Sequence, residues 1–141
     1  MSDSSDDQCV YCGDWFQCRD HLVPASYMQV YRSYAKGTTV KCCHLCNNLA
    51  GDFVAFTVGD KAAHIEKRYR KRFKKVLKLP HWDEWELKQL DYGLRDMVIK
   101  NQHMKRLILI KLENLELVQA GFEPVPIRGF NSHLDAIQYK P

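Results

Sequence analysis

The segments Cys9-Val10-Tyr11-Cys12 and Cys43-His44-Leu45-Cys46 decide the fold of this 141-residue chain. Two residues between paired cysteines let both sulfurs reach one metal ion from a tight turn. Four thiolates around Zn²⁺ make a closed, tetrahedral and therefore structural site. The residues between the pairs accommodate a hairpin and the entry to a helix. Since so short a segment buries little core, the metal supplies much of its stability. The spacing predicts structural zinc at Cys9, Cys12, Cys43 and Cys46.

Two further cysteines, Cys18 and Cys42, fall outside these pairs. Cys42 is an alternative ligand with a three-residue gap to Cys46, although Cys43 fits the preferred spacing better. We expect both extra thiols to pack as small hydrophobic side chains.

The composition is that of a globular protein, with 45% hydrophobic and 27% charged residues. The longest aliphatic run, Leu107 to Ile110, is far too short to span a bilayer. The first seven residues are acidic and polar, unlike a signal peptide. We therefore expect a cytoplasmic protein with reduced thiols, in which paired cysteines bind metal rather than form disulfides.

The net charge of +4 is unevenly distributed, because basic residues gather between Lys61 and Lys78 against Glu66 alone. Such a cluster suits a phosphate backbone, so we expect DNA as a partner. The alternative is a solvated helix face. The candidate nucleic-acid-binding residues are Lys67, Arg68, Arg70, Lys71, Arg72, Lys74 and Lys75.

The predicted fold class is α+β, a small zinc-stabilised core followed by a helical extension. Residues 1–7 form an acidic, disordered N-terminus, and residues 8–56 form the core. In the core we expect extended segments near 17–23 and 38–40 and a helix over roughly 45–53. Residues 57–120 form a basic, amphipathic helical region, and residues 121–141 an extended or disordered arm.

Capping signals divide the helical region. Thr57 or Asp60 caps a first helix that Pro80 ends. Asp83, with Glu86 at the third helical position and Trp82 packed on Leu87, begins a second helix.

The second helix continues to Gly121, with a bend or division at Gly93. Its run Leu107–Ile110 is apolar on every side. Either the rest of the chain or a second subunit covers this run, so the 94–118 helix is a candidate surface for a homodimer or protein partner.

The order CxxC, then Asp20-His21-Leu22-Val23-Pro24, then Cys43-His-Leu-Cys46-Asn47 resembles the zinc-containing HNH endonucleases. The string ending at Gly51 is especially similar to phage resolvases of the endonuclease VII type, and the helical extension resembles small phage-encoded HNH proteins. The resemblance covers roughly residues 9–52. It implies a ββα-metal or treble-clef core, and the host cytoplasm as the location of a phage-encoded protein.

The resemblance also implies roles for three residues. His21 would be the general base that deprotonates a water aimed at the scissile phosphate of DNA. Asp20 and Asn47 would hold one divalent ion, Mg²⁺ or Mn²⁺, through oxygen ligands. If Asp20 and His21 end a strand, one side chain can face the ion while its neighbour faces the water.

Two positions depart from the family pattern. Thr38 stands where many HNH motifs have an asparagine, and Ala50 where many have a lysine or an acidic residue. The competing interpretation is a zinc module that binds nucleic acid or protein without catalysis. In that interpretation His21 bonds to backbone and Asp20 is a turn or capping residue.

Overall fold

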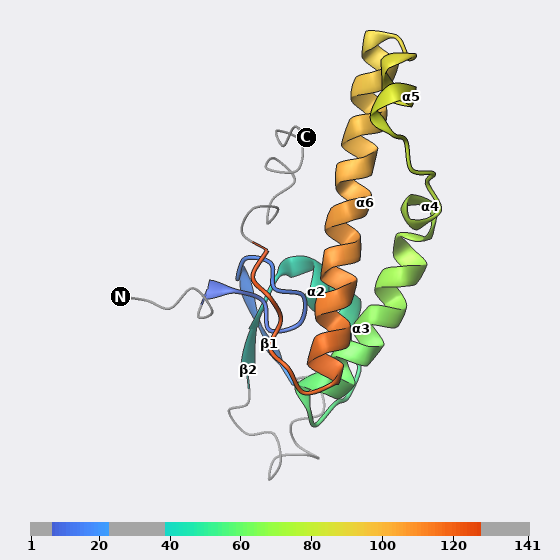
Figure 1. The fold of residues 1–141 in the computed structure, drawn as a ribbon. Coiled ribbons are helices and arrows are strands. Elements are labelled where there is room, and N and C mark those ends of the chain that lie inside the picture. The colour runs from blue at the N-terminus through green and yellow to red at the C-terminus, as the bar shows by residue number, and fades with distance from the viewer. Residues whose placement is uncertain (1–6, 23–38, 128–141) are drawn as a thin grey trace.

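A computed structural model describes residues 7–22 and 39–127 of the chain (Figure 1). The fold is α+β, with a two-stranded antiparallel sheet followed by helices. The elements are β1 (Cys18–His21), β2 (Thr39–Cys42), α2 (His44–Ala50), α3 (Val58–Arg72), α4 (Lys74–Leu77), α5 (Glu84–Lys88) and α6 (Tyr92–Gln119). The predictions for the acidic residues 1–6, for Pro24 and Thr38, and for the tail over 128–141 lie outside the described residues.

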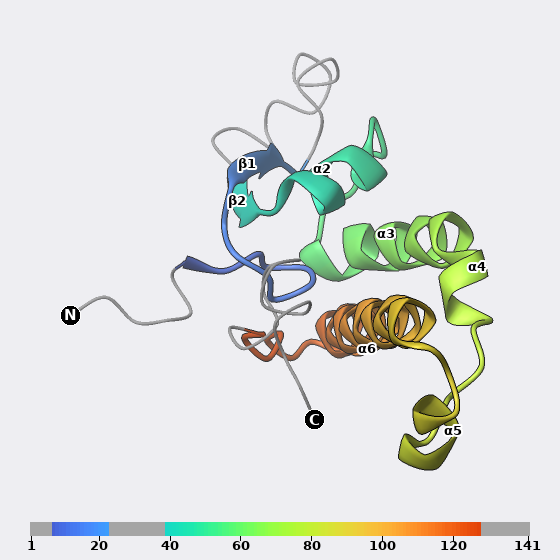
Figure 2. The same ribbon diagram turned by 90° about the horizontal axis from the view of Figure 1, so that it is seen from above.

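The elements form layers, which Figure 2 shows from above. The hairpin and α2 lie on one side, α3 lies in the middle, and α6 packs on the far side of α3. One core joins these layers: the buried cysteines and Leu49 meet Ile65 and Tyr69 of α3 and Leu115 of α6. The small sheet is thus anchored to the helical extension.

The first cysteine pair lies in a tight turn that Gly13 closes by donating its N–H to the Cys9 carbonyl at 3.0 Å. The chain then enters β1, which pairs with β2 in the register Cys18–Cys42, Arg19–Lys41, Asp20–Val40 and His21–Thr39. The predicted extended segments therefore exist, and β2 leads through Cys43 into α2 as expected.

Thr57 caps α3, and its hydroxyl accepts the N–H of Asp60 at 3.0 Å. The prediction of one helix up to Pro80 is wrong, because α3 ends at Arg72 and α4 begins anew at Lys74. Phe73 between them leaves helical geometry, and its ring contacts that of Tyr69. We attribute the break to core packing: Phe73 and the apolar residues of α4, Val76 and Leu77, pack on the buried cluster.

The second start signal is confirmed, since Asp83 and Glu86 form a reciprocal capping box on α5. The division at Gly93 is misplaced, because α5 ends at Lys88 and Gly93 lies in the first turn of α6. Asp91 makes the new start instead, as its carboxylate accepts the N–H of Leu94 at 2.9 Å. The Asp91 cap, and not Gly93, therefore determines where the new helix begins.

Gly121 ends α6 as predicted, with a positive φ of 91°. The N–H of Phe122 bonds to the carbonyl of Leu117 at 2.9 Å, and that of Gly121 to Val118 at 3.1 Å. This is the Schellman pattern, in which the chain turns back along its helix.

After this turn, residues 122–127 run back beside the first cysteine turn, where Pro124 and Ile127 are buried (Figure 1). The amide of Asn114 bridges the two segments: its Nδ2 donates to the carbonyls of Cys12 and Val125, both at 2.8 Å. This part of the arm is therefore extended and docked on the core.

The apolar run of α6 is largely covered by the chain itself. Leu107 and Ile108 are buried, whereas Leu109 is exposed. Within the described residues, none of the helices combines the length and the apolar character that crossing a bilayer requires.

Candidate metal centre and adjoining hairpin

The four predicted thiols lie together. The sulfurs of Cys9, Cys12, Cys43 and Cys46 are all within 4.8 Å of one another, and all four residues are buried. The Sγ atoms of Cys12 and Cys43 are 3.7 Å apart. Bond lengths of about 2.3 Å to a tetrahedral zinc place the sulfurs roughly 3.8 Å apart. The cluster could therefore hold a metal ion and is consistent with structural zinc.

The electrostatics of the cluster agree with this fit. Hydrogen bonds from Cys12, Cys46 and Cys9 hold the pKa of the Cys43 thiol far below its ordinary value. The same hydrogen bond to Cys43 raises the pKa of Cys12. The four buried sulfurs are close enough to interact with one another, and a soft divalent cation would replace the protons between them.

Cys42 and Cys18 lie outside this cluster and face each other across the two strands. Their sulfurs are 3.5 Å apart, and Cys42 is buried. Burial and the Cys18 contact raise the pKa of Cys42 well above its ordinary value. Its neutral thiol thus packs as a small hydrophobic group, as expected.

Two buried polar residues of α6 close the far side of the metal centre. Asn114 binds the carbonyl of Cys12, and the Lys111 ammonium lies 2.8 Å from the Asp14 carboxylate. Burial alone would lower the pKa of Lys111, but Tyr69, Cys12 and Asp14 together raise it above its ordinary value. A cation fixed here offsets part of the negative charge that four thiolates retain after binding Zn²⁺.

The Asp20 carboxylate is buried on the inner face of the hairpin. Its Oδ2 accepts hydrogen bonds from the Tyr11 hydroxyl and the Lys61 ammonium, each at 2.8 Å. Burial and the Asp20 charge raise the pKa of Tyr11 well above its ordinary value, so the phenol stays protonated and donates. Asp20 therefore has a defined position within an internal ion pair.

Lys61 is the first residue of the basic segment between Lys61 and Lys78, but its side chain is buried, with 0% of its surface exposed. Besides Asp20, its ammonium donates to the carbonyls of His21 at 2.7 Å and Leu22 at 3.1 Å. All three of its N–H groups thus have partners at the end of β1. The sequence carried a signal for this: Lys61 lies four residues before Ile65, on the apolar stripe of α3.

His21 and Asn47 complete the predicted trio. His21 ends β1 with its side chain exposed, on the face opposite to Asp20, which matches the expected alternation. Asn47 directly follows Cys46 in the first turn of α2 and is half-buried. The two segments that carry the trio, α2 and β1, are in contact with each other.

The candidate nucleic-acid-binding residues extend over the surface of α3 and α4, and all seven are exposed. Arg70 forms ion pairs with Glu66 at 2.9 Å and with Glu116 at 3.8 Å.

Nearer the start of α3, His64 stacks on Phe53 with ring centroids 4.1 Å apart. Partial burial and the cations of Arg68, Lys67 and Lys61 lower the pKa of His64.

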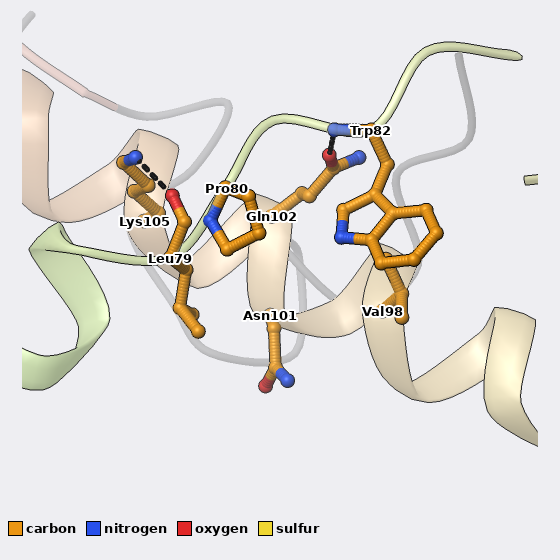
Figure 3. Close-up of a pocket in the computed structure, with 7 residues that line it drawn as sticks. All are labelled: Leu79, Pro80, Trp82, Val98, Asn101, Gln102 and Lys105. Carbon is orange, nitrogen blue, oxygen red and sulfur yellow. Dashed lines mark hydrogen bonds between the residues drawn. The ribbon is translucent and has the colours of Figure 1, made fainter. Parts of the chain in front are cut away.

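A hollow between α6 and the chain that links α4 to α5 is shown in Figure 3. Its cavity volume is about 80 Å³, and Lys105 closes one end by donating to the Leu79 carbonyl at 2.6 Å. Pockets for small organic ligands are typically several hundred Å³. This hollow therefore does not compete with the hairpin as the functional site.

Comparisons with protein-family models, curated proteins and solved structures returned no match. The described fold and site define a small α+β protein with a four-cysteine cluster that could hold a metal ion.

Proposed function

We propose that this protein is a metal-dependent HNH-type endonuclease that hydrolyses DNA phosphodiester bonds from a zinc-stabilised treble-clef core. The observation that carries the proposal is the placement of His21 and Asp20 on opposite faces at the end of β1. Zinc bound by the four cysteines would fix this strand beside α2, whose first turn contains Asn47. An exposed imidazole next to a buried carboxylate supplies a base facing solvent and an oxygen ligand behind it.

In the proposed reaction the neutral imidazole of His21 takes a proton from a water molecule. The resulting hydroxide attacks phosphorus, the bond to the 3′ oxygen breaks, and that oxygen is finally protonated by solvent. Imidazole suits this step because its unprotonated ring nitrogen can accept a proton from water and later release it. Lys61 assists by fixing the backbone carbonyls of His21 and Leu22.

Asp20 and Asn47 would hold the divalent ion, since carboxylate and amide oxygens are the ligands that Mg²⁺ and Mn²⁺ prefer. The Tyr11 and Lys61 bonds both reach Oδ2, so Oδ1 of Asp20 is the oxygen that would serve as ligand. A bound ion would neutralise the phosphate and stabilise the departing oxygen.

The basic surface of α3 and α4 would bind the DNA backbone beyond the cut. With a rise of about 1.5 Å per helical residue, Lys67 lies roughly 9 Å and Arg72 roughly 17 Å along α3 from Lys61. Base steps of about 3.4 Å make this span three to five steps from the cut. Contacts of this kind predict weak sequence discrimination and a steep dependence on salt.

The test is incubation of supercoiled plasmid with Mg²⁺ or Mn²⁺ and with the wild-type protein, His21→Ala or His81→Ala. His81 is an exposed histidine in the α4–α5 link and serves as the matched control. We expect cleavage by wild type and His81→Ala, and at least a hundredfold loss in His21→Ala with zinc content unchanged. Equal cleavage by His21→Ala would refute its role as the base.

A second candidate, a zinc module that binds nucleic acid without cutting it, is favoured by one observation. The Lys61 ammonium already neutralises Asp20, which weakens the attraction of this carboxylate for a divalent ion. This candidate predicts plasmid binding with no cleavage by the wild-type protein on supercoiled, linear or branched DNA.

A further inference from the structure

Two cysteines outside the metal cluster, Cys18 and Cys42, face each other across the hairpin. They lie directly opposite in the register of β1 and β2, which run side by side in Figure 1. Their sulfurs are 3.5 Å apart, and the Cys18 sulfur also lies 3.6 Å from the Cys42 carbonyl oxygen. The two side chains therefore point toward each other and are already in contact.

The backbone at this pair is placed as a disulfide requires. Directly opposite residues of antiparallel strands have Cα atoms about 4.5–5.5 Å apart, and disulfides bridge Cα separations of about 4.4–6.8 Å. A bond between the sulfurs can thus form by rotation of the two side chains, with the strand register unchanged. We propose that Cys18 and Cys42 form a dithiol that a small disulfide such as glutathione disulfide oxidises to a cross-strand disulfide. The inference is independent of the proposed function.

The two thiols differ in access, which sets the order of reaction. Cys18 is partly exposed at the start of β1, whereas Cys42 has 0% of its surface exposed. A disulfide in solution can therefore reach Cys18 but not Cys42. Since exchange proceeds through a mixed disulfide, Cys18 is the residue that forms it and Cys42 the residue that resolves it.

The reaction balances with the small disulfide as its oxidant. The Cys18 sulfur attacks as a thiolate, the sulfur–sulfur bond of the small disulfide breaks, and the released small thiolate takes the proton that Cys18 lost. The Cys42 sulfur then attacks the Cys18 sulfur of the mixed disulfide and passes its proton to the second departing small thiolate. Two cysteines are thereby oxidised, and one small disulfide is reduced to two thiols.

The metal cluster makes this pair selective. Of the six cysteines in the chain, four lie together in the cluster, where a bound metal would hold their sulfurs. Cys18 and Cys42 then remain as the two free thiols. Although Cys42 directly precedes Cys43, the crosslink uses no sulfur of the cluster. It would join β1 to β2 when the ratio of small disulfide to small thiol rises, and it would leave the metal bound.

The experiment exposes the full, zinc-loaded chain to glutathione disulfide and compares wild type with Cys18→Ser and Cys42→Ser. These variants are matched, because each removes one thiol of the pair and keeps the size of the side chain. Remaining thiols are trapped by alkylation, intact mass and zinc content are measured, and peptide mapping locates any crosslink.

We expect the wild type to lose two hydrogen atoms, with Cys18 linked to Cys42 and its zinc retained. Cys42→Ser should stop at the mixed disulfide on Cys18 and hold roughly tenfold more of it than the wild type, because groups already in contact react faster than separate molecules. Cys18→Ser should stay unmodified, since Cys42 is buried.

A wild type that stays reduced, that keeps glutathione on Cys18, or that first links any cysteine of the cluster would overturn the inference. Peptide mapping of the wild type alone gives this answer, so the test holds should either variant fail to fold. The same mapping decides the matter in a chain that holds no zinc, because only a link between Cys18 and Cys42 supports the proposal.

Discussion

At the residue scale, the buried ion pair between Lys61 and Asp20 organises the end of β1. A lysine is almost never fully buried unless it is paired, and here its ammonium bonds to a carboxylate and two carbonyls. Sequence reasoning identified Asp20 and His21 as a pair of interest but not the cation that fixes them. Lys61 belongs to a basic segment, and the signal that it points inward is its place on the apolar stripe of α3, four residues before Ile65.

Replacing Lys61 with methionine keeps the apolar stem and removes the charge. We expect a loss of about 3–5 kcal/mol in the free energy of unfolding, because the Asp20 carboxylate is left buried without its counter-ion. Denaturant titration measures this, with exposed Lys67→Met expected within about 0.5 kcal/mol of wild type. The double variant Asp20→Asn/Lys61→Met should lose less than the sum of the single changes; strict additivity would show that the pair is not coupled.

Gly13 is a second residue on which the core depends. It has a φ of 82°, and a Cβ there would lie 2.5 Å from the Val125 carbonyl oxygen. Gly13→Ala should lower the thermal midpoint far more than Gly121→Ala, which has a similar φ of 91° but open space around its Cβ position. Backbone strain alone costs about 1–2 kcal/mol, so equal midpoints would show that the arm over 122–127 does not dock on the first cysteine turn.

We expect His64 to report on DNA if DNA binds at the basic surface as proposed. Partial burial and three nearby cations lower its pKa below the ordinary value of 6.5. The folded protein therefore favours the neutral form of His64. Its contribution to the free energy of unfolding is fully present above pH 6.5 and is lost as the pH falls through the lowered pKa. Phosphates beside Arg68 and Lys67 should raise the pKa of His64, which NMR titration with and without duplex would detect. An unchanged pKa under saturating duplex would place the DNA elsewhere.

At the scale of elements, local capping signals were predicted better than the breaks within the helical region. The caps at Thr57 and Asp83 and the turn at Gly121 depend on side chains within a few residues, which a sequence reveals directly. The break between α3 and α4 depends instead on how Phe73 and Val76 meet the core. Contacts between distant segments of this kind have no local signature. The docked arm was missed for the same reason, since its partner Asn114 lies on α6.

Asn114 ties α6 to the first cysteine turn through three hydrogen bonds, two donated to Cys12 and Val125 and one accepted from the Val125 N–H. We expect Asn114→Ala to cost about 2–3 kcal/mol, because it leaves buried backbone groups without partners. Asn101→Ala on the same helix is exposed and should change the free energy of unfolding by less than about 0.5 kcal/mol. Hydrogen exchange at the Val125 N–H, which donates to Asn114, would locate the effect, and unaltered protection there would contradict the role of this bridge.

At the scale of the whole molecule, the metal centre and the helical extension form one unit. Lys111 and Asn114 of α6 reach the segment that carries Cys9 and Cys12, and α3 packs between α6 and the hairpin. The sequence predicted which four cysteines lie together, because their spacing in two pairs indicates them. The sequence-based prediction placed the helices in a separate extension, because no local pattern around Lys111 and Asn114 indicates that they lie next to the cysteines.

Removal of the metal should therefore affect more than the cysteine segment. Structural zinc contributes roughly 10–16 kcal/mol in small peptides, which is as large as the total stability of many domains. A chelator should abolish cooperative unfolding and expose α6 to hydrogen exchange. If α6 kept its protection while residues 9–51 lost theirs, the helical part would fold independently of the metal.

The central claim is that four cysteine sulfurs hold one zinc ion and thereby fix β1 beside α2. Elemental analysis combined with zinc X-ray absorption of the purified protein tests it most directly. We predict one zinc per chain with four sulfur neighbours at about 2.3 Å, and loss of tight zinc binding in Cys43→Ser. A folded protein without metal, or zinc with nitrogen or oxygen in place of one or more sulfurs, would contradict the claim.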